Sequence, residues 1–452
     1  MCAHKERLRM VDYDVIVVGC GPAGLKAATE LKKAGINVAG IDKKPDLSKN
    51  IRSASGYFIT GQEMNGEYIS LEPAGKTTKI HYTKCGFTID YSGHLEPIHH
   101  THIVSHSQKH LQITSTQKPL FNLFNPTKWL SDRYGEAQQA KVPFFTSTLV
   151  LKVKEVPQGV EVTLRKDGST RTLTCSKLIA SDGLQSRIAH NLGFNRDRAL
   201  FGKGCTVEYE MDNLDVPYDR GDIFIFGEKN IGLSAAVIMI PSMRSKKAYR
   251  VETLSPIPAE MATRIIEFMI HNGALAKWFK KGQIVEKTGA IVGIAAPIKV
   301  PYRGNVLLVS DAAAFAETLY QGATMCGFMA AKAMVEELAG KDGFAAYTHW
   351  WNSTFEWNTN PLRMADYTKR SLIFRFITPD ELDFLFDLGA KQPLVAETLE
   401  ANPYDYTNGL VDYFLTLPGL PQPLIEKLKI MRTADMGTWA TLVAKAKEKM
   451  AK

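Results

Sequence analysis

Residues 13–42 read YDVIVVGCGPAGLKAATELKKAGINVAGID, and this stretch decides the fold. A short apolar run rich in β-branched residues, 15–19, stops at a glycine and leads directly into apolar residues at helical spacing. A second apolar run, 37–41, follows and closes on Asp42. This order predicts a buried strand, a tight turn, a helix and a second buried strand.

The turn between the first strand and the helix has the pattern Gly19-x-Gly21-x-x-Gly24. The first glycine makes the tight turn, the second lets the backbone approach a pyrophosphate, and the third lets the helix pack against the strand. The helix N-terminus presents unpaired N–H groups and a positive dipole end to the phosphates. Asp42 lies 18 residues beyond Gly24, close to where a carboxylate accepts from a ribose hydroxyl. The pattern predicts a dinucleotide site, with a glycine-rich structural turn as the alternative.

The composition is that of an ordinary globular enzyme, since 45% of the 452 residues are apolar and 23% are charged. This length predicts two or three structural units. The net charge is +8, yet no basic block with interleaved aromatic residues is present, which argues against nucleic-acid binding. The six cysteines are scattered without a Cys-x-x-Cys pair. Their spacing argues against an iron–sulfur cluster or a zinc knuckle and fits a reducing cytoplasm.

The expected location is the cytoplasm. The N-terminus reads MCAHKERLRM and lacks the apolar segment of a signal peptide. No segment approaches the ~18 apolar residues needed to span a bilayer. Near the C-terminus, basic residues leave peripheral contact with an anionic membrane as the alternative to a solvated face. These residues are Lys427, Lys429, Lys445, Lys447 and Lys449.

The rest of the chain alternates between strand-like and helix-like stretches. Residues 43–117 have the short alternating runs of antiparallel strands, and Asn125-Pro126 is typical of a helix start with asparagine as the cap. The further expected elements are a meander at 149–156, 160–165 and 171–175, buried strands at 178–180 and 306–309, and helices at 258–272 and 322–338.

Three segments in this order resemble the FAD-dependent oxidoreductase superfamily that includes aromatic hydroxylases and geranylgeranyl reductases. The first is the glycine turn. The second is IASDGLQSRIAHNLG, where Asp182 and Gly183 match the family's Asp-Gly motif. The third is VLLVSDAAAFAETLYQGATMCGFMAAKAM, which is similar to the Gly-Asp motif and the helix after it. Within the superfamily, the run from Gly322 to Gly327 resembles the glycine-rich helix start of geranylgeranyl reductases.

The resemblance implies FAD as the cofactor. Asp311 would bind the ribityl chain, and the Gly322-Ala323 turn would aim a helix N-terminus at the pyrimidine edge of the flavin, where the reduced ring is negative. The small-residue loop that begins at Arg52-Ser53 would run past the cofactor. The expected cofactor-binding residues are Gly19, Gly21, Pro22, Ala23, Gly24, Asp42, Lys43, Arg52, Ser53, Asp182, Gly183, Asp311, Gly322, Ala323 and Thr324.

Some positions depart from the family pattern. Ser310 stands where the family usually has glycine, and the loop 53–56 lacks the cysteine often found there. The segment 232–251 resembles the strand pair over the substrate cavity of geranylgeranyl reductases, with Met239 and Ile240 in place of the aromatic residues usual before the proline.

The resemblance also implies an α/β fold. It has a Rossmann-like FAD-binding domain of the glutathione-reductase type, an inserted substrate domain with a mainly antiparallel sheet, and a helical C-terminal region. The FAD-binding domain would be assembled from residues 1–80, 119–198 and 299–345. The substrate domain would take residues 81–118 and 199–298, and the helical region residues 346–452.

The leading functional hypothesis is reduction of a carbon–carbon double bond in a hydrophobic, isoprenoid-like substrate by hydride from reduced flavin N5. The alternatives are a flavin monooxygenase acting on an aromatic or polyketide-like ring and an electron-transfer flavoprotein without turnover. No second glycine fingerprint exists, so NAD(P)H would bind transiently or a ferredoxin-like protein would donate electrons. Tyr320 and Gln321, just before the expected flavin-facing helix, are the candidate catalytic residues, with simple packing as the alternative.

Six histidines crowd the segment 94–110. Imidazole is a common metal ligand, and His100 and His102 share one strand face. No carboxylate or thiol cluster accompanies them, so we predict no metal site. We expect a solvated or structural strand, with a proton donor in the substrate cavity as the alternative.

Overall fold

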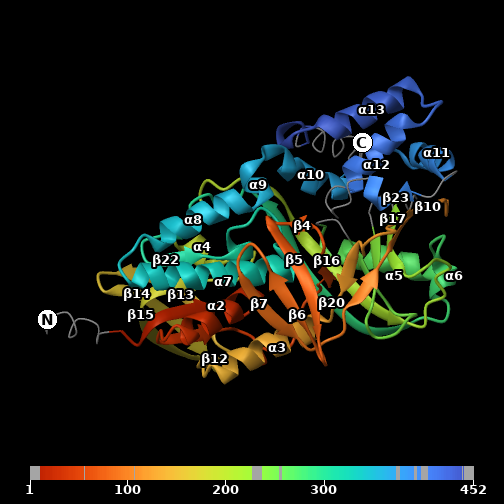
Figure 1. Ribbon diagram of the computed structural model, residues 1–452. Helices are drawn as coiled ribbons and strands as arrows, with labels where there is room; N and C mark the ends of the chain where they lie inside the picture. The colour runs from red at the N-terminus through yellow and green to blue at the C-terminus, as the bar shows by residue number, and fades with distance from the viewer. Residues whose placement is uncertain are drawn as a thin grey trace, which may run out of the picture.

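The computed structural model describes residues 11–54, 56–105, 107–226, 237–253, 257–372, 377–390, 394–398, 406–439 and 441. Within them the chain forms two eight-stranded sheets, two smaller sheets and the helices that cover them (Figure 1). Several positions named above lie outside these residues. They are the first half of the expected strand pair, 232–236, together with His106, Lys445, Lys447 and Lys449.

The first sheet contains the strands predicted to bind the dinucleotide. Its order is β12 (Phe144–Phe145), β2 (Val38–Ile41), β1 (Tyr13–Val18), β15 (Ser169–Ala180), β14 (Gly159–Lys166) and β13 (Leu149–Val156), and β22 (Val306–Leu308) joins β15 and pairs with β21 (Tyr302–Arg303). Strands β12, β2, β1, β15 and β22 run parallel to one another. Their carboxyl ends therefore meet at one edge of the sheet, where α/β proteins bind ligands.

Strand β15 corrects one expectation, because the segments predicted as separate strands at 171–175 and 178–180 form a single strand. Its first part pairs antiparallel with β14 and its second part pairs parallel with β1 and β22, with Cys175 in register with both β14 and β1. The polar residues Ser176 and Lys177 separate the two predicted segments, but the strand continues through them. The Lys177 side chain points away from the strand and its ammonium group pairs with Glu337 at 2.8 Å.

The second sheet is mainly antiparallel, as expected. Its order is β20 (Gln283–Ala295), β16 (Leu200–Asp212), β19 (Tyr249–Thr253), β18 (Val237–Pro241), β17 (Gly221–Phe226), β9 (His100–Ser105), β10 (His110–Thr114) and β23 (Leu394–Val395). Side chains of α5 (Ala259–His271) and α6 (Ala276–Phe279) share an apolar cluster with one face of this sheet. Strand β9 lies parallel to β17, so a segment from early in the chain completes a sheet built mostly from later residues.

Two smaller sheets and the remaining helices complete the described chain. One sheet has the order β3 (Tyr57–Phe58), β11 (Phe121–Leu123), β8 (Glu96–Ile98), and the other β4 (Glu63–Met64), β5 (Glu67–Ala74), β6 (Thr77–Tyr82), β7 (Phe87–Tyr91). The helices are α2 (Pro22–Lys33), α3 (Pro126–Gln139), α4 (Arg187–Asn191), α7 (Leu319–Leu338), α8 (Gly343–Thr354), α9 (Glu356–Thr359), α10 (Pro361–Leu372), α11 (Pro379–Gly389), α12 (Tyr406–Thr416) and α13 (Gln422–Thr433). None of these helices is both long and apolar enough to cross a bilayer.

The helical C-terminal region is confirmed, and its helices α11 to α13 lie beside the end of the second sheet that carries β10 and β23 (Figure 1). The expected cap of α3 is also confirmed, because the Asn125 side chain accepts from the Lys128 N–H at 3.1 Å. The proposed domain boundary at 80/81 falls inside β6.

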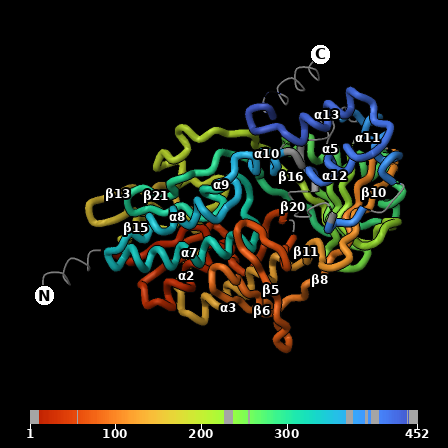
Figure 2. Tube along the Cα trace, turned by 45° about the horizontal axis from the view of Figure 1, so that its top comes forward, coloured from red at the N-terminus to blue at the C-terminus, as the bar shows by residue number. Residues whose placement is uncertain are grey.

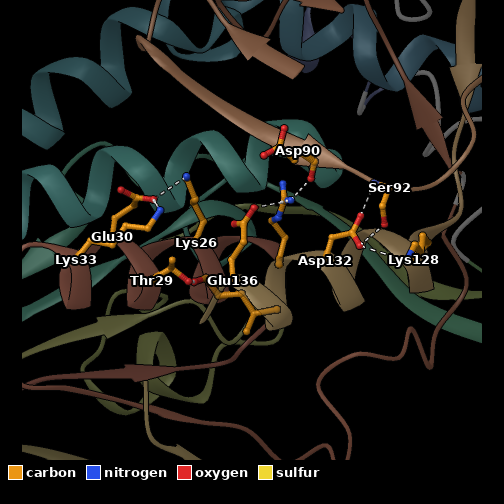
Figure 3. Close-up of polar contacts among 11 residues, drawn as sticks. Lys26, Thr29, Glu30, Lys33, Asp90, Ser92, Lys128, Asp132 and Glu136 are labelled. Carbon is orange, nitrogen blue, oxygen red and sulfur yellow. Dashed lines mark hydrogen bonds and ion pairs between the residues drawn. The ribbon is translucent and has the colours of Figure 1, made fainter. Parts of the chain in front are cut away.

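Buried cations lie where α2, α3 and β7 meet (Figure 3). Lys26 on α2 is 3% exposed, bonds to Glu30 of the same helix at 2.8 Å and lies 4.8 Å from the centre of the Phe87 ring on β7. Arg133 on α3 is 2% exposed, pairs with Glu136 of the same helix at 2.8 Å and donates to the Asp90 carbonyl on β7. A buried cation is costly unless it is paired, and the contacts with Phe87 and Asp90 tie both helices to β7.

Helices α2 and α7 lie side by side (Figures 1 and 2), and they meet at a glycine. A Cβ on Gly327 of α7 would stand 2.1 Å from the Ala23 carbonyl oxygen in the first turn of α2. That distance is too short for any side chain. Gly327 therefore sets how closely α7 approaches the N-terminus of α2.

We predict that Gly327→Ala lowers the free energy of unfolding by about 2 kcal/mol or more, because the added methyl group meets backbone that cannot move aside. Gly135 in α3 is the matched control, since a Cβ there has nothing within 4 Å. Gly135→Ala should stabilise the protein by about 0.5–1 kcal/mol. Thermal unfolding of both variants without added flavin measures the difference, and equal midpoints would contradict the close contact.

Candidate functional site

A cavity of about 550 Å³ lies at the carboxyl edge of the first sheet. It is lined by the turn after β1, the end of β2, residues 181–183 after β15, residues 309–311 after β22 and the first turn of α7. The described residues of the loop 49–56, which are 49–54 and 56, complete the wall together with residues 148–150. The volume falls within the usual range for cofactor pockets.

The glycine turn after β1 works through close backbone contacts. Gly19 has φ +88°, and a Cβ there would lie 2.3 Å from the Ser181 carbonyl oxygen. A Cβ on Gly24 would lie 1.9 Å from the Gly19 carbonyl oxygen. Only glycine fits either position, so the first turn of α2 packs directly against β1 and the turn after β15.

The N-terminus of α2 is open to the cavity. Its N-cap is Gly21, which has no side chain to cap the helix, and its first turn contains no acidic residue. A Cβ on Gly21 would have nothing within 4 Å, so its absence leaves space for a ligand. Free N–H groups and the helix dipole at this end favour an anion such as a pyrophosphate.

Asp42 stands at the end of β2 with its carboxylate held by the backbone. One oxygen accepts from the Cys20 N–H at 2.6 Å and the other from the Lys44 N–H at 2.8 Å. A carboxylate oxygen can accept more than one hydrogen bond. The carboxylate also lines the cavity, so it can take further bonds from the hydroxyls of a ribose.

Asp182 tests whether the cavity fits a polar cofactor. Its Oδ1 is buried and has no hydrogen-bond partner among the described residues, although the residue lines the cavity. Burial raises the pKa of this carboxyl group above its ordinary value. A buried acceptor without a partner is costly. A ligand that brings a hydroxyl group, as the FAD tether does, would satisfy this oxygen.

Asp311 follows a strained residue and is fixed by the start of α7. Ser310 has φ +61°, a left-handed conformation that costs a non-glycine residue ~1 kcal/mol and explains the family's usual glycine at this position. The Ser310 hydroxyl contacts the Thr318 hydroxyl at 2.6 Å. Asp311 Oδ1 accepts from the Thr318 N–H at 2.9 Å and from its hydroxyl at 2.7 Å. The carboxylate thus joins the turn after β22 to the N-cap of α7.

Helix α7 begins at Leu319, so one expectation about it was wrong. Tyr320 and Gln321 lie within the helix and not before it. Tyr320 lines the cavity, and its hydroxyl donates to Asn50 Oδ1 at 3.0 Å. Burial raises the pKa of Tyr320, so the phenol stays protonated. The Gln321 side chain accepts from the Ile59 N–H at 2.8 Å and does not line the cavity.

The cavity brings together most of the residues predicted to bind the cofactor. Those that line it are Gly19, Gly21, Pro22, Ala23, Asp42, Lys43, Arg52, Ser53, Asp182, Gly183, Asp311 and Ala323. Gly24, Gly322 and Thr324 are not among the lining residues. Gly24 contacts the Gly19 backbone in the turn after β1, and Gly322 faces Asn65 and Thr318. The Thr324 hydroxyl donates to the Tyr320 carbonyl at 2.7 Å.

The sequence reasoning missed residues 148–150, Gln185 and Asn50, which also line the cavity. A signal for the first group was present. Strand β12 runs parallel to β2, and Thr148 follows it at the same carboxyl edge. Asn50 carries no motif, and only the folded loop places it beside Tyr320.

The histidines form part of the second sheet. His102 is completely buried, and its ring contacts His110 Nε2 at 3.0 Å and the Asp219 carbonyl at 2.8 Å. Burial lowers the pKa of His102 to about 4, so the ring is neutral at pH 7. None of the described histidines lines the cavity, and no group of metal-ligating side chains is found in the described part of the chain.

The FAD binding domain family matches residues 12–315, more than half of the chain. The chain belongs to this family. It is an FAD-dependent oxidoreductase, and the cavity has the features that the cofactor requires. These features are the open N-terminus of α2, the carboxylate at the end of β2 and the buried acceptor at Asp182.

The chain is similar to curated reductases and to solved structures of a reductase-like protein and of other flavin-dependent enzymes. The chain is 23% identical over 442 residues to digeranylgeranylglycerophospholipid reductase 1 of Methanosphaera stadtmanae, covering 94% of this chain and 99% of the relative. A geranylgeranyl bacteriochlorophyll reductase-like structure from Thermoplasma acidophilum matches with a TM-score of 0.63 at 19% identity, covering 92% of this chain and 99% of that one. The flavin-dependent halogenase CmlS has a TM-score of 0.59 at 15% identity, covering 93% and 77%. These structures share the fold.

We predict that Asp311→Ala lowers the affinity for FAD by roughly 10- to 100-fold and lowers the FAD occupancy with it, because a hydrogen bond to a charged group contributes about 1.5–3 kcal/mol. Flavin absorbance per protein after dialysis measures the occupancy. Thr318→Val is the control, since it removes one of the two bonds to Asp311 but the residue does not line the cavity. It should keep most of its flavin. Equal losses in the two variants would show that Asp311 acts only by holding α7.

Proposed function

We propose that this FAD-dependent oxidoreductase reduces a carbon–carbon double bond in a hydrophobic, isoprenoid-like substrate. The observation that carries the proposal is the similarity to digeranylgeranylglycerophospholipid reductase 1, which extends over 99% of that relative. The match therefore includes the second sheet, which is the part expected to receive the substrate, and most of the C-terminal helices. Similarity limited to the cofactor-binding segments would favour any flavoprotein of this fold equally.

The loop 49–56 supports the proposal by its position. Ile51 lines the cavity with 61% of its surface exposed, which leaves an apolar side chain at the open side of the site. The Ser53 N–H donates to the Gly289 carbonyl of β20 at 3.3 Å, and Arg250 of β19 donates to the Ala54 carbonyl. The loop is therefore held by the second sheet, and a substrate bound beside it would reach the cofactor cavity.

Each part of the proposed reaction can be assigned to particular residues of this chain or to the cofactor. When bound and reduced, FAD supplies the hydride. The N-terminus of α2, Asp42 and Asp182 hold the cofactor, and the start of α7 stabilises negative charge with its dipole. Tyr320 and Asn50 are joined by a hydrogen bond at the cavity wall, so they can orient a ligand bound against the first turn of α7. The electrons come from a separate donor, NAD(P)H or a ferredoxin-like protein.

We predict that the holoprotein, reduced with dithionite and mixed without oxygen with geranylgeranylglycerol phosphate lipid, converts the lipid to products with added pairs of hydrogen atoms. Mass spectrometry of the extracted lipid measures the change, and the reduced flavin should reoxidise in step with it. Heat-unfolded protein with the same amount of free FAD is the control.

A different result would favour the alternative chemistry. If the lipid stays unchanged and rapid NAD(P)H oxidation needs both oxygen and a phenolic compound, with one oxygen atom added to the ring, the protein is a monooxygenase. A flavin that exchanges electrons with a partner protein and changes neither compound would indicate electron transfer. Either outcome would overturn the proposed reduction.

A further inference from the structure

Two glutamates lie directly opposite each other on neighbouring strands of the second sheet. Glu208 on β16 is in register with Glu252 on β19, and they are only 6% and 9% exposed. Their neighbours Tyr209 and Val251 belong to the apolar cluster with α5. Side chains alternate along a strand, so the two carboxyl groups point to the other face, toward the loop 49–56.

Both carboxyl groups contact one hydroxyl. Ser53 Oγ lies 2.8 Å from Glu252 Oε1 and 3.1 Å from Glu208 Oε2. A serine hydroxyl has a single hydrogen to donate, and an ionised carboxylate can only accept. If both glutamates were ionised, one of these two contacts would have no hydrogen. The geometry therefore favours a proton on one carboxyl group, which donates to the Ser53 oxygen and lets the Ser53 hydroxyl donate to the other.

The groups around Glu208 and Glu252 indicate which of the two carries the proton. Glu208 Oε1 accepts from the Thr288 hydroxyl at 3.1 Å, so its second oxygen already has a donor and its ionised form is favoured. Burial, together with the charge of Glu208, raises the pKa of Glu252 to about 7. The charge of Arg250 on β19 acts in the opposite direction on both glutamates. Burial, and to a smaller extent the charge of Glu210 on β16, also raises the pKa of Glu208. Glu252 is the proton-bearing member.

We propose that Glu252 and Glu208 share one proton and that Ser53 passes it into the cofactor cavity. Ser53 is the member of this group that lines the cavity, whereas the two glutamates stand behind it. The three residues form an uninterrupted path from the second sheet to the site. The inference rests on the proposed function, because alkene reduction is a reaction that needs a proton there.

The step is balanced in atoms and charge. The hydride of the proposed reduction adds to one alkene carbon with two electrons and breaks the π bond. The other carbon takes the hydrogen of the Ser53 hydroxyl, and Ser53 takes the proton of Glu252. Glu252 is left as a carboxylate beside Glu208. This arrangement is unfavourable for like charges, so Glu252 regains a proton from water before the next turnover.

Infrared difference spectroscopy on the flavin-free protein tests the shared proton without any turnover. Ordinary carboxyl groups are ionised by pH 6, so a carboxylic C=O band that disappears between pH 6 and pH 8 belongs to a group with a raised pKa. We expect this band in the wild type, at a lower frequency in D₂O, and its loss in Glu252→Gln. The control is Glu210→Gln, which makes the same change on β16, the strand that carries Glu208, and should keep the band. A wild type without the band, or a Glu252→Gln variant in which the band keeps its full intensity, would overturn the shared proton.

Alkene reduction by the dithionite-reduced holoprotein tests the delivery. The wild-type rate per bound flavin should fall as the pH rises through about 7. Ser53→Ala keeps the glutamate pair and should lower the rate by about 100-fold, the usual contribution of a proton donor, with its infrared band retained. Ser53→Thr, which keeps a hydroxyl, should recover much of that loss.

The outcomes separate this inference from the proposed function. A wild type that reduces the alkene, with a Ser53→Ala variant that has the same rate and pH profile, would overturn the delivery and leave the proposed function intact. A wild type that reduces no alkene at any pH would overturn the proposed function and the delivery with it, while the infrared band would still report on the shared proton.

Discussion

The structure depends on a backbone contact that only glycine permits. Missing Cβ atoms at Gly19 and Gly24 let β1, the first turn of α2 and the turn after β15 touch one another, with a Cβ on Gly24 falling 1.9 Å from the Gly19 carbonyl oxygen. Gly327 continues this packing by bringing α7 onto α2. The open end of one helix and the start of another are thereby held around one edge of the sheet.

The second sheet depends on this arrangement as well. The loop 49–56 leaves the first sheet after β2 and is fixed by β19 and β20 through its backbone and by a pair of buried glutamates through Ser53. The cofactor cavity is consequently walled by residues of the first sheet on one side and by a loop tied to the second sheet on the other. Chemistry proposed for the cavity can draw on groups in either sheet.

The local parts of this account could be predicted from the sequence. The order β1–α2–β2, the Asn125 cap and the turns at Asp182 and Asp311 follow from spacing and residue type within short segments. The start of α7 was misplaced by three residues, because its N-cap is Thr318, held by Asp311. The glutamate pair could not be foreseen, since it depends on the register between two strands that are separated by 36 residues of sequence.

The central claim is that the cavity at the carboxyl edge of the first sheet holds FAD with its pyrophosphate at α2. Titrating the flavin-free protein with FAD and with FMN, followed by quenching of flavin fluorescence, tests it most directly. FMN lacks the adenosine that would contact Asp42. It also lacks the second phosphate group of the pyrophosphate. The account predicts one FAD per chain and binding of FMN weaker by about 100-fold or more. Equal affinity for the two flavins, or no binding of FAD, would contradict it.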